Sequence, residues 1–186
     1  MKYVILTDSR QQKEEHILKE FDKQGILHIR TGLPSADYMA LRYSLQKGMY
    51  LDYSILIDTK KDIEEIAGNL CNTQNHERVK REILRGQELG AKEFIFLINS
   101  GKVKSIEDLQ NWTSKRTKVK GSTLIKVFQT MKQRYNVRFV LVPKKEMGKK
   151  IIELLSKKWY NLFIRWQKRI YMGILVAIWN FTSMSV

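Results

Sequence analysis

The sequence predicts an α/β fold in which a mixed β-sheet is flanked by helices. Two observations carry this prediction: short apolar runs with strand character cluster in the first 60 residues, and helix and strand patterns alternate after them. A chain of 186 residues suits one domain with an appendage and can bury a real hydrophobic core. The sequence divides by composition into a domain over residues 1–143 and a basic, tryptophan-rich tail over residues 144–186.

The first 60 residues are expected to hold most of the sheet. Residues 3–6 form a β-branched and aromatic run typical of a buried strand. Residues 11–24 then place Ile17, Leu18 and Phe21 at helical spacing, and Gly25 is positioned to end that helix. Three further strands are predicted over residues 26–29, 37–44 and 51–58, with a turn at Pro34 before the second of these.

Helices and strands alternate from residue 61 onward. Helices are predicted over residues 61–70 and 76–89, with a short helix near Asp108 and another that Ser122 caps and that runs to about Tyr135. Strands are predicted over residues 94–98 and 138–142, the last stopped by Pro143.

The tail carries three of the four tryptophans among lysines and arginines, namely Trp159, Trp166 and Trp179. An amphipathic helix is expected there. Docking on the sheet, burial at a dimer interface and contact with a membrane surface remain three open interpretations of this helix.

Charge is the most informative part of the composition. Lysine and arginine number 34 against 19 acidic residues, a net charge of +15, which favours a polyanionic partner such as DNA. Membrane surfaces and acidic proteins stay open as alternatives. The hydrophobic fraction of 43% excludes a disordered or fibrous protein.

Several features bear on location. The single cysteine, Cys71, excludes an internal disulfide and a zinc cluster, which suits a reducing compartment. The apolar run at the start is too short for a signal peptide, and the run over residues 170–181 is too short to span a bilayer. We expect a cytoplasmic or nucleoid-associated protein that is not secreted and does not depend on a membrane.

Three aspartates stand where predicted strands begin or end. Asp8 follows the first strand, Asp37 opens the third and Asp58 ends the fourth. Carboxylates that converge at buried strand ends repel one another unless a divalent cation holds them, and Mg²⁺ takes such oxygen ligands. Strand alternation puts Lys60 on the same side as Asp58, beside such a cation. As alternatives, Asp58 caps the next helix and Asp8 is a turn residue.

The flanking segments resemble a known family. Residues 3–11 end in Asp8-Ser9-Arg10-Gln11 and resemble an apolar strand followed by Asp-x-Arg-Glu. Residues 33–38, ending in Asp37-Tyr38, resemble a Gly-Asp-Tyr segment, and residues 55–60 resemble Val-Glu-Arg-Lys. These are the signature segments of the XPF-type nuclease domain, a branch of the PD-(D/E)xK or restriction-endonuclease-like enzymes, and the likeness extends over residues 1–143.

The resemblance implies a restriction-endonuclease-like fold and a Mg²⁺- or Mn²⁺-dependent endonuclease that cuts DNA with branches, flaps or single-stranded segments. It implies catalytic roles for Asp37, Asp58 and Lys60 and metal ligation by Asp8, Asp37 and Asp58. No small-molecule cofactor is expected, and a homodimer is expected by analogy, through the helix holding Phe128 or through the tail. Supporting roles are open for Arg10, Glu20, Asp62 and Glu64. Glu14, Glu15 and Glu20 lie on the first predicted helix, where such charges are more often solvated.

The sequence departs from the family pattern at four positions. Ala36 replaces a glycine, Asp58 replaces a glutamate, Thr59 replaces an arginine and Gln11 stands where the family often has glutamate. The loss of the arginine removes a guanidinium that can bind phosphate. A catalytically degenerate DNA-binding module and another PD-(D/E)xK enzyme, such as a Holliday junction resolvase, are therefore kept as alternatives.

A basic stretch follows the strand over residues 94–98. Lysines and arginines dominate residues 101–138, and Trp112 lies among them as a residue that either stacks on an unpaired base or belongs to the core. We expect DNA-backbone contacts from this stretch and from the helix after the catalytic turn. The expected DNA-binding residues are Arg78, Arg81, Trp112, Lys115, Arg116, Lys118 and Lys120.

Overall fold

The computed structural model describes residues 3–12 and 14–156. The chain divides into two compact units, Met1–Ile152 and Glu153–Val186, and each is described by itself. Of the second unit, residues 153–156 are described, and they are helical. The predicted domain boundary at residue 143 and the predicted helical tail stay predictions, because residues 157–186, which hold the three tail tryptophans, lie outside the described residues.

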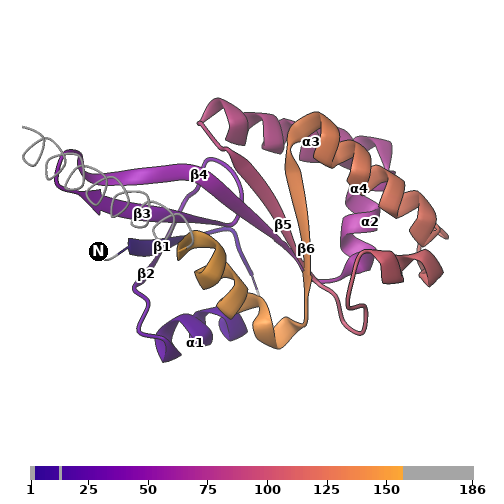
Figure 1. The fold of residues 1–186 in the computed structure, drawn as a ribbon, viewed down its shortest axis with the longest axis horizontal. Coiled ribbons are helices and arrows are strands. Elements are labelled where there is room, and N and C mark those ends of the chain that lie inside the picture. The colour runs from indigo at the N-terminus through magenta and orange to yellow at the C-terminus, as the bar shows by residue number, and fades with distance from the viewer. Residues whose placement is uncertain (1–2, 13, 157–186) are drawn as a thin grey trace, which may run out of the picture. The chain divides into compact units, whose positions relative to one another are not determined.

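A six-stranded mixed sheet forms the centre of the first unit (Figure 1). Its strands lie in the order β2-β1-β3-β4-β5-β6. The antiparallel pairs are β1 with β3 and β3 with β4, and the remaining neighbours are parallel. Their bounds are β1 Tyr3–Asp8, β2 His28–Thr31, β3 Tyr38–Ser44, β4 Gly48–Lys60, β5 Glu93–Asn99 and β6 Val137–Val142.

Helices cover both faces of this sheet, and Figure 1 shows α2, α3 and α4 grouped away from α1. Strand alternation divides the core between the faces, since Leu56 belongs to the cluster formed with α2, α3 and α4, whereas the equally buried Ile57 does not. The predicted mixed sheet flanked by helices is confirmed. The helices are α1 Glu15–Lys23, α2 Ile63–Cys71, α3 Thr73–Glu88, α4 Gly121–Tyr135, the short η1 Glu107–Asn111 and η2 Lys144–Glu146, and a helix over residues 147–156.

Several expected element starts differ from the structure, and the helix starts show why. The first helix begins at Glu15 rather than at residue 11, and α3 begins at Thr73, where the Asn72 side chain accepts a 3.1 Å hydrogen bond from the Asn75 backbone. Ser122 does not cap α4, which already begins at Gly121. A β-carbon at Gly121 would lie 1.6 Å from the Leu109 carbonyl oxygen, so this close approach admits only glycine.

The pairing of β3 with β4 contains an irregularity. Tyr38 faces Ile57, whereas Ala40 faces Asp52, so β4 has extra residues between these two pairs. Inside the bulge, the Asp52 carboxylate accepts hydrogen bonds from the Ser54 backbone, at 3.1 Å, and from the Ser54 hydroxyl, at 2.5 Å. The bulge divides β4 into a hairpin half and a half that leads to Asp58 and Lys60.

Two further features concern the Phe128 side chain and the possibility of a membrane-spanning helix. The Phe128 ring is buried and stacks on Phe139 with 3.9 Å between ring centroids, so its side chain is part of the core and not of a surface for dimerisation. Among the described residues, no helix is both long and apolar enough to cross a membrane.

Candidate active site

Three neighbouring strands bring Asp8, Asp37 and Asp58 to one edge of the sheet. The Asp8 backbone N–H donates to the Asp37 carbonyl at 2.8 Å, and the Asp37 N–H donates to the Ile57 carbonyl at 2.9 Å. The carboxyl ends of β1 and β4 therefore meet the amino end of the antiparallel β3. The sequence motifs, separated by up to about 50 residues in the chain, converge as predicted.

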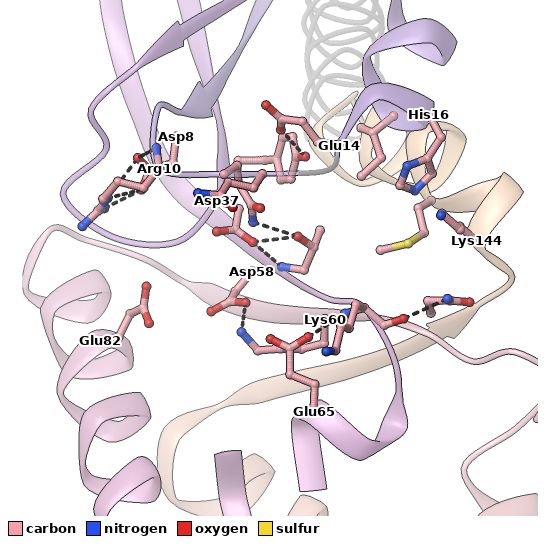
Figure 2. A pocket seen from close by; sticks show the side chains of 18 of the residues that line it. Asp8, Arg10, Glu14, His16, Asp37, Asp58, Lys60, Glu65, Glu82 and Lys144 are labelled. Atoms are coloured by element: carbon pink, nitrogen blue, oxygen red, sulfur yellow. Dashed lines mark hydrogen bonds and ion pairs between the residues drawn. The ribbon is translucent and has the colours of Figure 1, made fainter. Parts of the chain in front are cut away.

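A cavity of about 900 Å³ opens at this edge (Figure 2). Asp8, Asp37, Asp58 and Lys60 all line it, so the structure brings together the four residues on which the sequence argument depended. The cavity is also lined by residues from the first turn of α1, from α3 and from the segment after β6, which include Glu14, His16, Glu82, Arg85 and Lys144.

Asp37 is half-buried and is held through one carboxylate oxygen. Its Oδ2 accepts hydrogen bonds from the Thr59 backbone N–H and from the Thr59 hydroxyl, both at 2.7 Å. Among the described residues, no hydrogen bond reaches its Oδ1. Burial and the neighbouring Asp58 carboxylate raise the pKa of Asp37 to about 7, against the hydrogen bonds from Thr59.

Asp58 and Lys60 form a buried ion pair, with exposed fractions of 4% and 8%. The Lys60 ammonium donates to Asp58 Oδ1, as the predicted strand alternation requires. Burial raises the pKa of Asp58 to about 6, although Lys60 opposes the shift. Burial also favours a neutral lysine, but Asp58 outweighs it and raises the pKa of Lys60, so the ammonium stays charged. Asp58 is not the helix cap.

Asp8 is engaged by Arg10. The guanidinium donates to both Asp8 oxygens, and its Nη2 also donates to the Leu33 carbonyl at 2.8 Å. Burial raises the pKa of Asp8, but these hydrogen bonds outweigh it and hold that pKa below its ordinary value. The predicted supporting role of Arg10 therefore takes the form of neutralising Asp8, and Asp8 is less free to bind a metal than Asp37.

The carboxylates of Asp37 and Asp58 fit a cation that needs only one or two protein ligands. The described residues contain no group of three His, Cys, Asp or Glu side chains close enough to hold a metal, and joint metal ligation by Asp8, Asp37 and Asp58 stays a prediction. Arg10 donates to both oxygens of Asp8. Asp37 and Asp58 remain, and Mg²⁺ is commonly held by one or two carboxylates together with water and substrate phosphate.

The acidic residues expected to support the site lie elsewhere. Asp62 caps α2 by accepting from the Glu65 backbone at 2.7 Å. Glu64 accepts from the Ser114 hydroxyl at 2.6 Å and from the Lys115 backbone at 2.7 Å, so it holds the basic loop. Glu20 accepts from the Gln24 side chain at 2.6 Å and does not line the cavity. None of the three faces the carboxylate pair.

Three other glutamates line the cavity instead. Glu14, expected to be a solvated helix charge, is 5% exposed and accepts from the Tyr38 hydroxyl at 2.7 Å. Glu65 accepts from the Lys61 backbone at 2.9 Å, and Glu82 from the Ala36 backbone at 3.2 Å. Glu82 could have been found from helical spacing, since it lies four residues after Arg78 on one face of α3. Nothing in the sequence distinguishes Glu14 from its charged neighbours.

The φ angle of Ala36 explains why the family pattern has glycine at this position. Ala36 adopts φ 62°, in the left-handed region that favours glycine. Its side chain is buried, and its backbone N–H is the group that donates to Glu82. The chain thus keeps the turn before β3, and the position of Asp37, with a residue that is strained there.

The predicted DNA-binding residues divide into two groups. Arg78 and Arg81 are exposed and line the cavity, together with Arg85, which the sequence argument missed. Lys115, Arg116, Lys118 and Lys120 are exposed on a separate loop and do not line it.

Trp112 and Ser114 organise the loop that carries these lysines. Trp112 is half-buried and packs against the hydrophobic core, which supports the core interpretation of this residue rather than base stacking. The Ser114 hydroxyl accepts from the Thr117 backbone and hydroxyl, both at 2.9 Å, and donates to Glu64. Because Glu64 lies in the first turn of α2, just after Lys60, the loop is fixed near the end of β4 that carries Asp58 and Lys60.

The structure of this chain is similar to solved structures of other proteins, whereas its sequence is not matched. No model of a known protein family matches the sequence, and no curated protein matches it. The structure is similar to that of XPF from Aeropyrum pernix, with a TM-score of 0.57 and 16% identity over 89% of this chain and 71% of that one. It is also similar to XPF from Aeropyrum pernix in complex with DNA, with a TM-score of 0.58 and 16% identity over 86% of this chain and 66% of that one. The chain thus shares the fold of these XPF structures, and the predicted fold class, a restriction-endonuclease-like mixed sheet flanked by helices, is confirmed.

Proposed function

We propose that this protein is a metal-dependent DNA endonuclease that hydrolyses phosphodiester bonds. The observation that carries the proposal is the convergence of Asp37, Asp58 and Lys60 in one cavity of an XPF-like fold. Two carboxylates with raised pKa values beside a charged lysine form a group whose repulsion a divalent cation relieves. Such perturbed groups in a cavity favour a functional site over a structural one.

Asp37 and Asp58 would hold Mg²⁺ or Mn²⁺. The free Oδ1 of Asp37 and the second oxygen of Asp58 supply hard oxygen donors, as these cations require. When bound, the cation polarises the scissile phosphate and lowers the pKa of a water molecule. The two side chains fix the site where that phosphate lies.

Lys60 acts as an ammonium in this proposal. Its raised pKa keeps it protonated, so it stabilises negative charge on the phosphate and orients water rather than abstracting a proton. Its Nζ also lies 5.4 Å from the centroid of the Phe96 ring, which fixes the side chain from the side of the core.

DNA would approach over the arginines of α3 and the lysine loop. These exposed cations can contact the phosphate backbone without reading sequence. One of the two similar structures is a complex of XPF from Aeropyrum pernix with DNA, which supports DNA as the partner proposed here. Branched, flap or fork DNA is the proposed substrate, and a homodimer remains a proposal without a surface assigned to it.

One alternative rests on specific observations, and a second would share the same residues. Thr59 stands in place of an arginine, and Asp8 is neutralised by Arg10, which favours a catalytically degenerate module that only binds DNA. A Holliday junction resolvase of the PD-(D/E)xK class would use the same carboxylates and lysine on four-way DNA.

Cleavage of labelled flap, fork, four-way and linear duplex DNA tests the proposal. The wild-type protein should cut branched DNA with Mg²⁺ or Mn²⁺ and not with EDTA. Asp37→Asn should abolish cutting and keep DNA affinity within about twofold, since it removes a ligand and one negative charge. Glu88→Gln, an exposed carboxylate at the end of α3, is the matched control and should cut as the wild type does.

The other outcomes distinguish the alternatives. Binding without cutting of any substrate refutes the nuclease and supports the DNA-binding module. Cutting confined to four-way DNA supports the resolvase. Unchanged cutting by Asp37→Asn removes Asp37 from the site.

A further inference from the structure

Two of the positions that depart from the XPF-type pattern are in contact. The Gln11 side-chain Nε2 donates to the Thr59 hydroxyl oxygen at 3.1 Å, and the same hydroxyl donates to Asp37 Oδ2 at 2.7 Å. These residues are 48 positions apart in the chain, in the loop after β1 and at the end of β4. A neutral hydrogen-bonded chain thus reaches from the loop to the carboxylate proposed to bind the cation.

The direction of these hydrogen bonds follows from the chemistry of the groups. A threonine hydroxyl has one proton, and the Asp37 carboxylate, in the ionised form that binds a cation, can only accept. The hydroxyl proton must therefore point to Asp37, which leaves the Thr59 oxygen as an acceptor for the Gln11 amide. A donor at Gln11 stabilises this one orientation of the hydroxyl.

The orientation of the Thr59 hydroxyl decides which oxygen of Asp37 remains available to bind a cation. The Thr59 backbone N–H and the Thr59 hydroxyl both donate to Oδ2, so two donors fix the plane of the carboxylate. The backbone N–H alone would leave the carboxylate free to turn about one hydrogen bond. With both donors on Oδ2, Oδ1 is the oxygen left for a cation in the cavity that Asp37 and Asp58 both line.

We propose that Thr59 and Gln11 are positioning residues that pre-organise Asp37 for a divalent cation, with Gln11 acting through the Thr59 hydroxyl. The inference rests on the proposed function, because it concerns the carboxylate assigned there to the cation. It gives a role to the two substitutions that the family pattern alone would count as losses.

The test measures Mn²⁺ binding to the protein without DNA, by titration calorimetry. Thr59→Val keeps the β-branched shape and the backbone N–H but removes the hydroxyl, and it should weaken Mn²⁺ binding about fivefold, as expected for one hydrogen bond. Thr59→Ser restores the hydroxyl and should bind within about twofold of the wild type. Gln11→Leu should weaken binding about twofold to threefold.

The double variant separates a chain from two independent effects. If Gln11 acts through the hydroxyl, Gln11→Leu should add nothing to Thr59→Val. Gln133→Leu is the control: Gln133 is exposed on α4 and does not line the cavity, so this change should leave binding at the wild-type value. Thermal midpoints measured in EDTA check that every variant is folded.

Wild-type binding of Mn²⁺ by Thr59→Val overturns the proposal, and so do additive effects of the two substitutions. Failure of the wild type itself to bind Mn²⁺ overturns the proposed function together with this inference. Metal binding and cutting by the wild type, with no effect of Thr59→Val, overturns this inference alone.

Discussion

Stability in the absence of metal should fall as the pH rises from about 4 to about 7. Asp37 and Asp58 have folded-state pKa values of about 7 and about 6, above the ordinary value of 3.8. The folded protein therefore retains protons that the unfolded chain has released in this window, and the free energy of unfolding declines with pH. Above about pH 7 both states have released them, and the decline ends.

The size of the effect follows from the shift. One pKa unit corresponds to about 1.4 kcal/mol, so a shift near 3 units at Asp37 sets an upper limit of about 4 kcal/mol. Relaxation around a half-buried carboxylate brings the expected loss to about 1–2 kcal/mol. For a chain of this length the thermal midpoint should fall by about 3–8 °C between pH 5 and pH 8.

Differential scanning fluorimetry in EDTA and in Mg²⁺ measures both parts of this prediction. Mg²⁺ should raise the thermal midpoint more at pH 8 than at pH 5, because it competes with protons for the carboxylates. Asp37→Asn should flatten the pH dependence, whereas the exposed control Glu88→Gln should keep it. An equal pH slope in the wild type and Asp37→Asn, or no response to Mg²⁺ at pH 8, would refute the reasoning.

Two further predictions concern packing and DNA contact. Gly121→Ala should destabilise the fold by about 3 kcal/mol because its β-carbon meets the Leu109 carbonyl, whereas Gly68→Ala, in open space within α2, should stabilise it by up to about 1 kcal/mol in urea unfolding. Replacing Arg78, Arg81 and Arg85 by alanine should lower the slope of log affinity against log salt by about 2–3, as measured by fluorescence anisotropy with Ca²⁺. An unchanged slope would place the DNA elsewhere.

Local patterns predicted much of this fold. Every predicted strand is present, and the alternation of β4 correctly put Asp58 and Lys60 on the same side. The order of strands in the sheet was beyond the sequence argument, because the pairing of β1 with β3 joins residues more than 30 positions apart. The positions of the aspartates at strand ends suggested that they converge, and the family likeness strengthened this expectation, but the strand order that brings them together was not predicted.

Partners of the individual charges were the least predictable feature. Asp8 was expected to be a ligand, yet its nearest cation is Arg10, two residues away, and a strand end followed by a turn permits either outcome. Glu14 was expected to be exposed to solvent, yet its side chain is buried and accepts a hydrogen bond from the Tyr38 hydroxyl. Such contacts depend on side-chain directions in irregular segments, which carry no repeating pattern.

The bulge between Tyr38 and Ala40 has a consequence for how the protein can change over evolutionary time. Residues that are added or lost in the hairpin around Leu45, which is 91% exposed, alter only the pairing on the far side of the bulge. The near side keeps the Tyr38–Ile57 pairing and hence the register of Asp37 with Asp58. The hairpin half of β4 should therefore tolerate changes in length and composition, or accept a grafted peptide, without disturbing the half that carries Asp58 and Lys60.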